Sequence, residues 1–454
     1  MPYGGPASIL ADGPVAPLGQ HSLLLLLLQV GVLLALALLF GRLAVRWGMP
    51  AVVGELMVGV LLGPSLLERF APALTDWLFP KEPGQFHLLD AFSQIGLMLL
   101  VGVTGTQLNL GLLRRQGTTA LRVSVGGLVV PLAFGIGVAF LLPDRLVPGD
   151  VDRAVFAFFL GVAMCVSALP VIAKTLSDMG FLHRPVGQLI LTAGMVDDTV
   201  AWFLLSLVTA LATAGLTAGH VGLALASLAV FLVLACTVGR MAVRAVLRRT
   251  TRSAEPGATV AAVVVMVLLS AAGAHALHQE PLFGAFVCGL VISSTGELAP
   301  NRLAALRTVV MAVFAPVFFA AAGLRMDLTG LADPVVLGAA FLLLFVAVLG
   351  KFLGAYAGAR LSRRSRWEAL ALGAGMNARG VVEVVIAMAG LRLGVLTTQM
   401  YTVIVLIAVV TSLMAPPILT LAMKRIEDTA EETAELKSSE EKTADEEIRE
   451  KAYG

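Results

Sequence analysis

The stretch Ala193–Trp202, AGMVDDTVAW, sets Asp197 and Asp198 side by side within a long apolar run. An ionised side chain costs about 2.5–3.5 kcal/mol at the centre of an isolated membrane helix. Neighbouring residues of a helix point about 100° apart, so the two carboxylates have different surroundings. One can pair with a cation on another helix, while the other faces a cavity and holds a proton or a small hard cation. The stretch therefore predicts an ion-binding site.

Apolar segments of membrane-spanning length recur along most of the chain. Of the 454 residues, 58% are hydrophobic and 14% are charged, and the mean hydropathy is +0.90. Soluble domains have about 25% charged residues, and about 20 apolar residues span a bilayer as a helix. The sequence predicts an all-α polytopic membrane protein. The 13 predicted transmembrane helices are residues 22–45, 51–67, 87–108, 119–142, 154–177, 187–211, 218–243, 258–276, 282–296, 305–325, 335–359, 367–390 and 399–423.

Three parts are predicted along the chain. Residues 1–21 form an extracellular N-terminal segment, 22–423 the transmembrane domain, and 424–454 an acidic cytoplasmic tail that is too polar to bury a core. Loops on one side carry most of the Lys and Arg. This predicts a plasma-membrane protein whose N-terminus is outside the cell and whose C-terminus is in the cytoplasm. The tail has no GxGxxG motif, and we expect no cofactor and no nucleic-acid partner.

Two apolar segments share a glycine pattern. VGELMVGVL (Val53–Leu61) and FGAFVCGLV (Phe283–Val291) both contain Gly–x4–Gly. They lie seven predicted spans apart and so cross the membrane in opposite directions, which is typical of an inverted-topology repeat. Gly-rich apolar helices also resemble one another by chance, so this pattern alone does not decide the matter.

The same offset pairs the two most irregular spans, residues 154–177 and 367–390. Proline removes a backbone donor, so the first helix is predicted to break at Ser167, Ala168 and Pro170. Four residues interrupt the apolar run of the second: Asn377, Arg379, Gly380 and Glu383. Unwound backbone at membrane depth is tolerated where it lines a cavity, and paired broken helices indicate a substrate site.

Five ionisable residues lie well inside predicted spans, at Asp197, Asp198, Lys351, Arg379 and Glu383. Their similar depth favours one shared site, although inert structural ion pairs are an alternative. Glu55 and Asp90 lie near predicted span ends, and we expect both to reach an interface with water.

Seven stretches, in this order, resemble those of the monovalent cation:proton antiporter-2 family, which includes bacterial Na⁺/H⁺ and K⁺/H⁺ exchangers. They are PAVVGELMVGVLLGPSLL (Pro50–Leu67), SALPVIAKTL (Ser167–Leu176), MVDDTVAWFLL (Met195–Leu205), LFGAFVCGLVI (Leu282–Ile292), APVFFAAAGLRMDL (Ala315–Leu328), GKFLGAYAGARL (Gly350–Leu361) and MNARGVVEVV (Met376–Val385). The resemblance covers about residues 22–423.

The resemblance implies the sodium/proton antiporter fold. This is a homodimer of 13-helix subunits, with a dimerisation domain and a six-helix core in which the two broken helices cross. It also implies an elevator-like movement of the core that exchanges cytoplasmic cation for external protons.

The resemblance also implies roles for the buried charges. Asp198 is the residue that binds the cation (Na⁺ or K⁺) and the proton, and Ser167 helps to line the site. Asp197 pairs with Lys351. Arg379 and Glu383 form an ion pair that steadies the crossing.

One departure and several alternatives bear on the transported ion. At Gly105–Leu110 the chain reads GTQLNL, where family members often read G-L-E-x-D-L, so Gln107 and Asn109 replace two carboxylates. We favour Na⁺/H⁺ exchange, with K⁺/H⁺ exchange as the alternative and organic-anion symport on a similar fold as a further one. We do not expect an enzyme, because an intramembrane aspartyl protease needs its two aspartates on different helices.

Overall fold

The regular secondary structure of the described residues is entirely helical. The computed structural model describes residues 18–80, 83–107, 110–169, 172–173, 176, 181, 184–214, 218–252, 256–298 and 300–426. Most of the predicted N-terminal segment and acidic tail, together with Pro170 and Asn109, lie outside these ranges.

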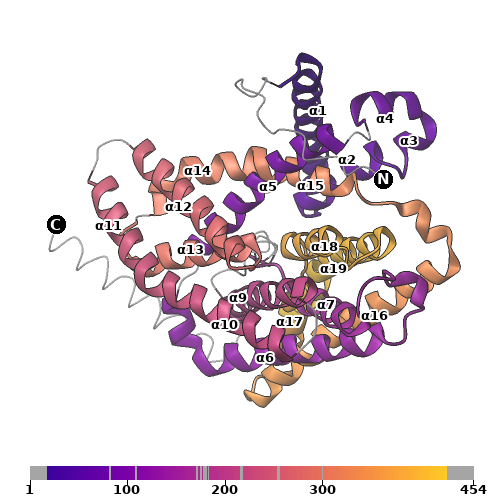
Figure 1. Ribbon diagram of the computed structural model, residues 1–454. Helices are drawn as coiled ribbons and strands as arrows, with labels where there is room; N and C mark the ends of the chain where they lie inside the picture. Colours follow the sequence, from indigo (N-terminus) through magenta and orange to yellow (C-terminus); the bar gives the residue numbers. More distant parts are fainter. Residues whose placement is uncertain are drawn as a thin grey trace.

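Along the part of the chain that the structure describes, the α-helices follow one another without any intervening sheet (Figure 1). Their bounds are α1 (Gln20–Arg46), α2 (Ala51–Leu62), α3 (Leu67–Phe70), α4 (Pro72–Leu78), α5 (Pro83–Thr106), α6 (Leu110–Ala139), α7 (Arg153–Cys165), α9 (Pro185–Ala214), α10 (Ala218–Leu234), α11 (Arg240–Thr250), α12 (Pro256–Ala276), α13 (Pro281–Thr295), α14 (Ala304–Val309), α15 (Ala315–Gly323), α16 (Pro334–Leu361), α17 (Arg366–Met376), α18 (Val381–Arg392) and α19 (Thr398–Lys424).

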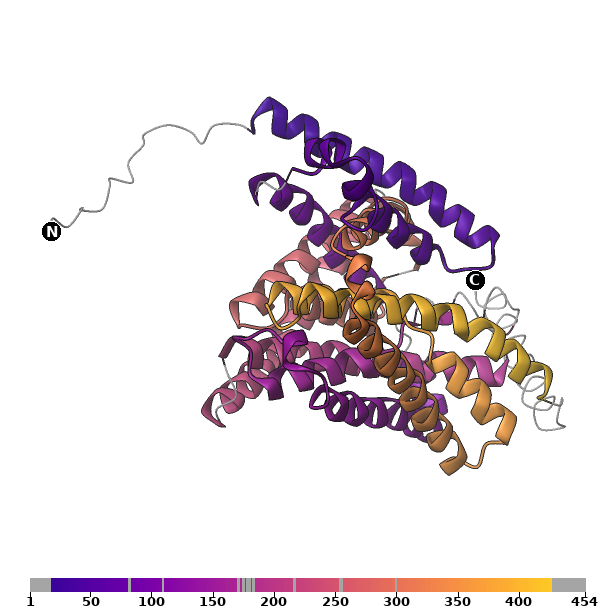
Figure 2. The ribbon, with the colours of Figure 1, turned by 90° about the vertical axis from the view of Figure 1, so that its right-hand side faces the viewer.

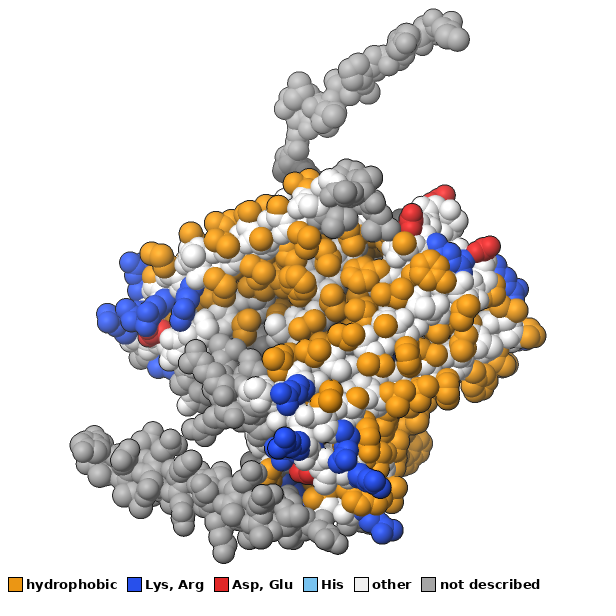
Figure 3. All heavy atoms as spheres, turned by 90° about the horizontal axis from the view of Figure 1, so that it is seen from below, with side chains coloured by type: hydrophobic (Ala, Val, Ile, Leu, Met, Phe, Trp, Pro, Cys, Tyr) orange, Lys and Arg blue, Asp and Glu red, His pale blue; other side chains and the backbone are white. Residues whose placement is uncertain are grey.

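Ten helical segments in the described part of the chain are long and apolar enough to cross a membrane. Two shorter apolar helices, α7 and α13, accompany them. Short π-helical turns at Ala235–Gly239 and Val310–Phe314 join α10 to α11 and α14 to α15. Many large hydrophobic side chains face outward, and Figure 3 shows them spread over one face of the molecule, with Lys and Arg in separate groups toward its edges. The chain is a multi-pass membrane protein.

The helices form two sets that are interleaved in the sequence (Figures 1 and 2). The first set comprises α1, α2, α5, α12, α13 and α15, and the second comprises α6, α7, α9, α16, α17, α18 and α19. Within the second set, α6 and α16 approach so closely that a Cβ at Gly354 would lie 2.0 Å from the carbonyl oxygen of Gly126. The functional residues discussed below lie mainly in this second set.

The first glycine of each predicted repeat packs against a helix of the same repeat. A Cβ added to Gly54 of α2 would lie 2.2 Å from the carbonyl oxygen of Phe40 on α1. A Cβ added to Gly284 of α13 would lie 2.5 Å from the carbonyl oxygen of Ser270 on α12. Both positions therefore require glycine for the same reason, which is close contact between two helix backbones.

The second glycine of each repeat packs against a helix from the other half of the chain. A Cβ at Gly59 would lie 2.0 Å from the carbonyl oxygen of Ala320 on α15, and one at Gly289 would lie 2.2 Å from that of Gly102 on α5. The two glycine motifs thus make corresponding contacts with exchanged partners, as two related halves would.

Candidate ion-binding site

The end of α7 and the segment between α17 and α18 lie side by side in the second set. Helix α7 ends at Cys165, and Val166 is extended (φ −79°, ψ 144°). Between α17 and α18, Gly380 has φ 159° and ψ −112°, the mirror image of an extended conformation, which favours glycine. The backbone N–H of Ala168 donates to the carbonyl of Ala378 at 3.0 Å, so the two interruptions lie side by side. The first interruption begins just before the predicted Ser167.

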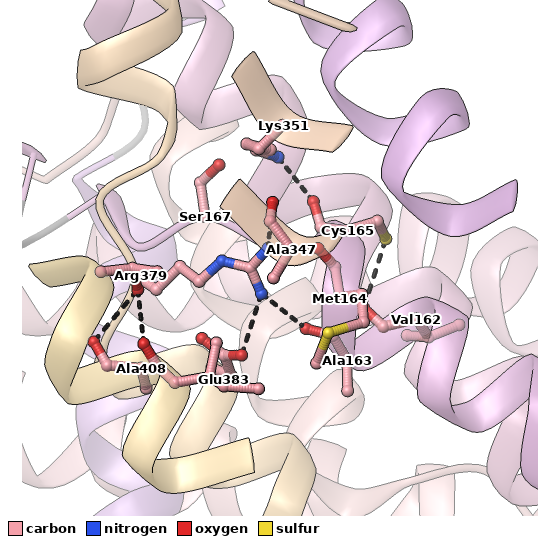
Figure 4. Close-up of polar contacts among 12 residues, drawn as sticks. Val162, Ala163, Met164, Cys165, Ser167, Ala347, Lys351, Arg379, Glu383 and Ala408 are labelled. Carbon is pink, nitrogen blue, oxygen red and sulfur yellow. Dashed lines mark hydrogen bonds and ion pairs between the residues drawn. The ribbon is translucent and has the colours of Figure 1, made fainter. Parts of the chain in front are cut away.

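Side chains satisfy the last four carbonyls of α7 (Figure 4). A helix leaves these carbonyls without an intrahelical partner, and its C-terminus carries partial negative charge. The donors are Cys165 Sγ to Val162 at 3.3 Å, Arg379 Nη1 to Ala163 at 3.3 Å, Arg379 Nη2 to Met164 at 2.5 Å and Lys351 Nζ to Cys165 at 2.5 Å. Two buried cations, Lys351 from α16 and Arg379 from the segment between α17 and α18, therefore stabilise this helix end, a role that the sequence did not reveal.

Asp197 is fully engaged in hydrogen bonds. Its Oδ2 lies 2.5 Å from Lys351 Nζ and 2.9 Å from Ser167 Oγ, and its Oδ1 accepts from Ser124 Oγ at 2.5 Å. Asp197 and Lys351 are both 0% exposed. The structure thus brings together the pair that the resemblance implied. Sequence reasoning missed Ser124 of α6, whose signal is a polar residue inside an apolar span.

Asp198 differs sharply from its neighbour. It is 1% exposed, and neither carboxylate oxygen has a side-chain hydrogen-bond partner in the part of the chain that the structure describes; its nearby donor is the backbone N–H of Leu169. Burying an ionised carboxylate without partners is strongly unfavourable. Such a group is stable when it is neutralised, either by a proton or by a bound cation.

Arg379 and Glu383 form a second buried pair. Arg379 Nη1 lies 2.9 Å from Glu383 Oε1, and Ser412 Oγ donates to the backbone carbonyl of Arg379. We call Asp197, Asp198, Lys351, Arg379 and Glu383 the buried charge cluster. Its three carboxylates and two cations have a formal charge of −1 when all are ionised. One proton or one monovalent cation restores neutrality.

We call the place where the two interruptions lie side by side the junction. Of the predicted helix-break residues, Ala168 and Asn377 are both buried there. Asn377 directly follows α17, and Gly380 precedes α18. The expectation for Glu55 was wrong. It is 9% exposed and packs against Gly41 of α1, because nearness to a span end does not decide which way a helix faces. Asp90 is partly exposed and pairs with Arg325 at 3.0 Å.

A second polar group joins the two helix sets, and we call it the Glu280 cluster. Arg392 of α18 binds Glu280 at 2.9 Å and Gln94 of α5 at 3.1 Å. From α9, Ser206 donates to Gln279 at 2.6 Å and Thr209 to Glu280 at 3.4 Å. His275 and His278, which precede Glu280 in the chain, are exposed. No group of three His, Cys, Asp or Glu residues that could hold a metal ion occurs among the described residues.

Comparison with known proteins identifies relatives along nearly the whole chain. The family described as sodium/hydrogen exchanger, transmembrane, matches residues 31–425. The Na(+)/H(+) antiporter NhaS4 of Synechocystis sp. is 32% identical over 88% of this chain and 97% of its own. The Na(+)/H(+)-K(+) antiporter GerN of Bacillus cereus is 28% identical over 86% of this chain and 94% of its own. The chain spans about half (49%) of cation/H(+) antiporter 17 of Arabidopsis thaliana, to which it is 30% identical.

The fold has a solved counterpart. The structure of the sodium proton antiporter MjNhaP1 of Methanocaldococcus jannaschii superimposes with a TM-score of 0.67, covering 89% of this chain and 99% of that one. Because the two sequences are 16% identical, this likeness shows a shared fold.

Proposed function

Because the chain belongs to the transmembrane sodium/hydrogen exchanger family, we propose that it exchanges a monovalent cation for protons, with Na⁺ favoured and K⁺ as the alternative. The observation that carries the proposal is Asp198, a buried carboxylate without a cation or side-chain partner among the described residues, in a cluster of formal charge −1. The relatives named above include a Na⁺/H⁺ antiporter and one that also takes K⁺. An organic-anion symporter is disfavoured, since the cluster would repel an anion.

The chemistry follows from the different partners of the two aspartates. Asp197 is paired with Lys351, with Ser124 and Ser167 as further donors. Asp198 binds either a proton or the cation, and oxygen is the ligand type that hard cations prefer. Binding of the cation to Asp198 releases the proton, and binding of the proton releases the cation. Movement of the cation in one direction is therefore coupled to movement of protons in the other.

The ions cross by alternating access, in which the second helix set moves past the first as an elevator. The corresponding contacts of the two glycine motifs support an inverted-topology repeat, and the joined interruptions support two crossed broken helices. The ten long segments, the two broken helices and the short helix α13 together support 13 spans. We place the chain in the plasma membrane as a homodimer, as the family resemblance implies. The distribution of Lys and Arg between the loops supports an N-terminus outside and a C-terminus in the cytoplasm.

Everted membrane vesicles test the proposal directly. After respiration acidifies the lumen, adding NaCl or KCl should dissipate the pH gradient when the wild-type protein is present. Asp198→Asn should abolish this response. Asp333→Asn is a matched control, because Asp333 lies outside the buried charge cluster and pairs with Arg145 at 2.9 Å. Absence of a wild-type response to any monovalent cation would refute the proposal.

A further inference from the structure

Asn377 is a buried amide whose polar atoms are unused. It is 0% exposed, and neither Oδ1 nor Nδ2 has a hydrogen-bond partner among the residues the structure describes. Buried side-chain amides are almost always hydrogen-bonded, because losing their contacts with water is unfavourable. The side chain therefore needs an explanation beyond packing.

The position of Asn377 links it to the buried charge cluster. The carbonyl of Met376, directly before it, lies 2.8 Å from Ser167 Oγ, which is 2.9 Å from Asp197 Oδ2. The carbonyl of Ala378, directly after it, accepts from Ala168 N–H at 3.0 Å. The residues on either side of Asn377 are thus bonded to Ser167 and Ala168, and Ser167 is also bonded to Asp197.

Helix capping does not account for the amide. The backbone N–H of Asn377 continues the last turn of α17, donating to Gly373 at 3.1 Å and to Ala374 at 3.3 Å. Its side chain makes no cap bond, and Gly380, not Asn377, precedes α18. A residue needed only to end α17 would not require an amide.

Other polar atoms of the region without partners belong to residues that are otherwise engaged. Glu383 Oε2 and Arg379 Nε are unpartnered, but the two side chains bind each other through Oε1 and Nη1 at 2.9 Å. At the junction, Asp198 and Asn377 are the described residues whose polar atoms all lack a side-chain partner, and the backbone N–H of Leu169, directly after Ala168, lies close to Asp198. Asp198 supplies a negative charge and Asn377 a neutral oxygen.

We propose that the amide oxygen of Asn377 is a ligand of the transported cation, completing with Asp198 the oxygen set that selects among monovalent ions. This inference rests on the proposed function. An amide can accept through its oxygen and donate through its nitrogen, so it can also hydrogen-bond to Asp198 when that residue is protonated. Being neutral, it adds a ligand without altering the formal charge of −1 that a single monovalent cation balances.

Transport kinetics of Asn377→Leu in proteoliposomes test the proposal, since leucine has a similar size and no polar atom. We expect its KM for Na⁺ to rise about tenfold or more, with a Vmax within about twofold of wild type and a changed Na⁺/K⁺ preference. Thr259→Val is the matched control. Thr259 of α12 is also 0% exposed with an unpartnered hydroxyl, but it lies outside the buried charge cluster, so KM should not change.

Cation-dependent thermal stabilisation separates binding from folding. In detergent at alkaline pH, replacing choline chloride with NaCl should raise the Tm of the wild-type protein. Asn377→Leu should keep the Tm in choline and lose most of the rise. Asn377→Ser, which is smaller and polar, replaces the leucine variant where that variant does not fold, and the same loss is expected.

The outcomes distinguish the two proposals. A wild-type protein with neither transport nor a cation-dependent Tm shift would overturn the proposed function. A working wild type with unchanged KM and ion preference in the Asn377 variant would overturn only the role of Asn377. A lower Tm in choline with an undiminished response to NaCl would likewise overturn it, since the amide would then be structural.

Discussion

The buried charge cluster and the Glu280 cluster both join helices through ion pairs, yet their charge balance differs. In the Glu280 cluster both carboxylate oxygens of Glu280 have partners, and Arg392 balances its charge while remaining 31% exposed. In the buried charge cluster Asp198 has no side-chain partner among the described residues, and a formal charge of −1 remains. A balanced polar group connects two surfaces, whereas an unbalanced buried one is suited to taking up an ion.

The largest expected effect comes from breaking the ion pair in the buried charge cluster. Lys351→Met leaves Asp197 buried without its cation, and losing one partner of a buried pair costs about 3–5 kcal/mol. We expect a corresponding loss of unfolding free energy, measured by reversible unfolding in mixed detergent micelles.

Two controls sharpen this prediction. The double variant Lys351→Met with Asp197→Asn should recover part of the loss, because the charge left unpaired is removed. Asp198→Asn should cause no comparable loss, because Asp198 has no paired cation to lose among the described residues and an asparagine oxygen can still accept from a backbone N–H. A loss for Asp198→Asn as large as that for Lys351→Met would contradict the distinction between the two aspartates.

The next effect is competition between ions for one carboxylate. If a single proton displaces a single cation from Asp198, the apparent KM for Na⁺ should rise about tenfold for each unit by which the pH falls, once the pH is below the pKa of that carboxyl. Proteoliposome transport measured across a pH series gives this slope. A KM that is independent of pH would show that proton and cation occupy separate groups.

A smaller effect is expected at the Glu280 cluster. Arg392→Gln leaves the Glu280 carboxylate with Thr209 as its remaining partner among the described residues. Because Arg392 is partly exposed, we expect about 1 kcal/mol of lost stability. The turnover rate should change, because in the proposed movement this connection between helix sets must break. The KM for Na⁺ should not change; an increase like that expected for Asn377→Leu would place the Glu280 cluster in the ion-binding site.

The smallest effect is expected at Glu297, in the segment after α13. Hydrogen bonds from Arg244 and Arg248, at 3.0 and 2.9 Å, hold the pKa of its carboxyl below the ordinary value. Its stabilisation is therefore present above the unfolded-state pKa and is lost as pH falls through the lowered folded-state pKa. Glu297→Gln should lower Tm slightly at neutral pH in low salt and not at all in high salt or strong acid. A Tm loss that persists in high salt would indicate a role other than charge pairing.

The sequence predicted the features that depend on local composition. Charges inside apolar runs located the buried charge cluster, and Gly380 with Asn377 marked the interruption before α18. Partners that are distant in sequence could not be predicted, such as the α7 carbonyls that Arg379 binds. The predicted span 218–243 is shorter than the helix, which continues to Thr250, because an Arg-rich helix remains helical beyond its apolar part.

The capped end of α7 has a mechanical consequence. Lys351 comes from α16 and Arg379 from the segment before α18, so their bonds to the α7 carbonyls fasten three helices at one point. Sliding any of these helices separately would leave several carbonyls and a guanidinium unpaired in an apolar interior. The region around the ion should therefore be stiff, with backbone amides that exchange slowly with solvent. Large displacements should instead occur at the polar contacts between the two helix sets, because water can replace the hydrogen bonds that are broken there.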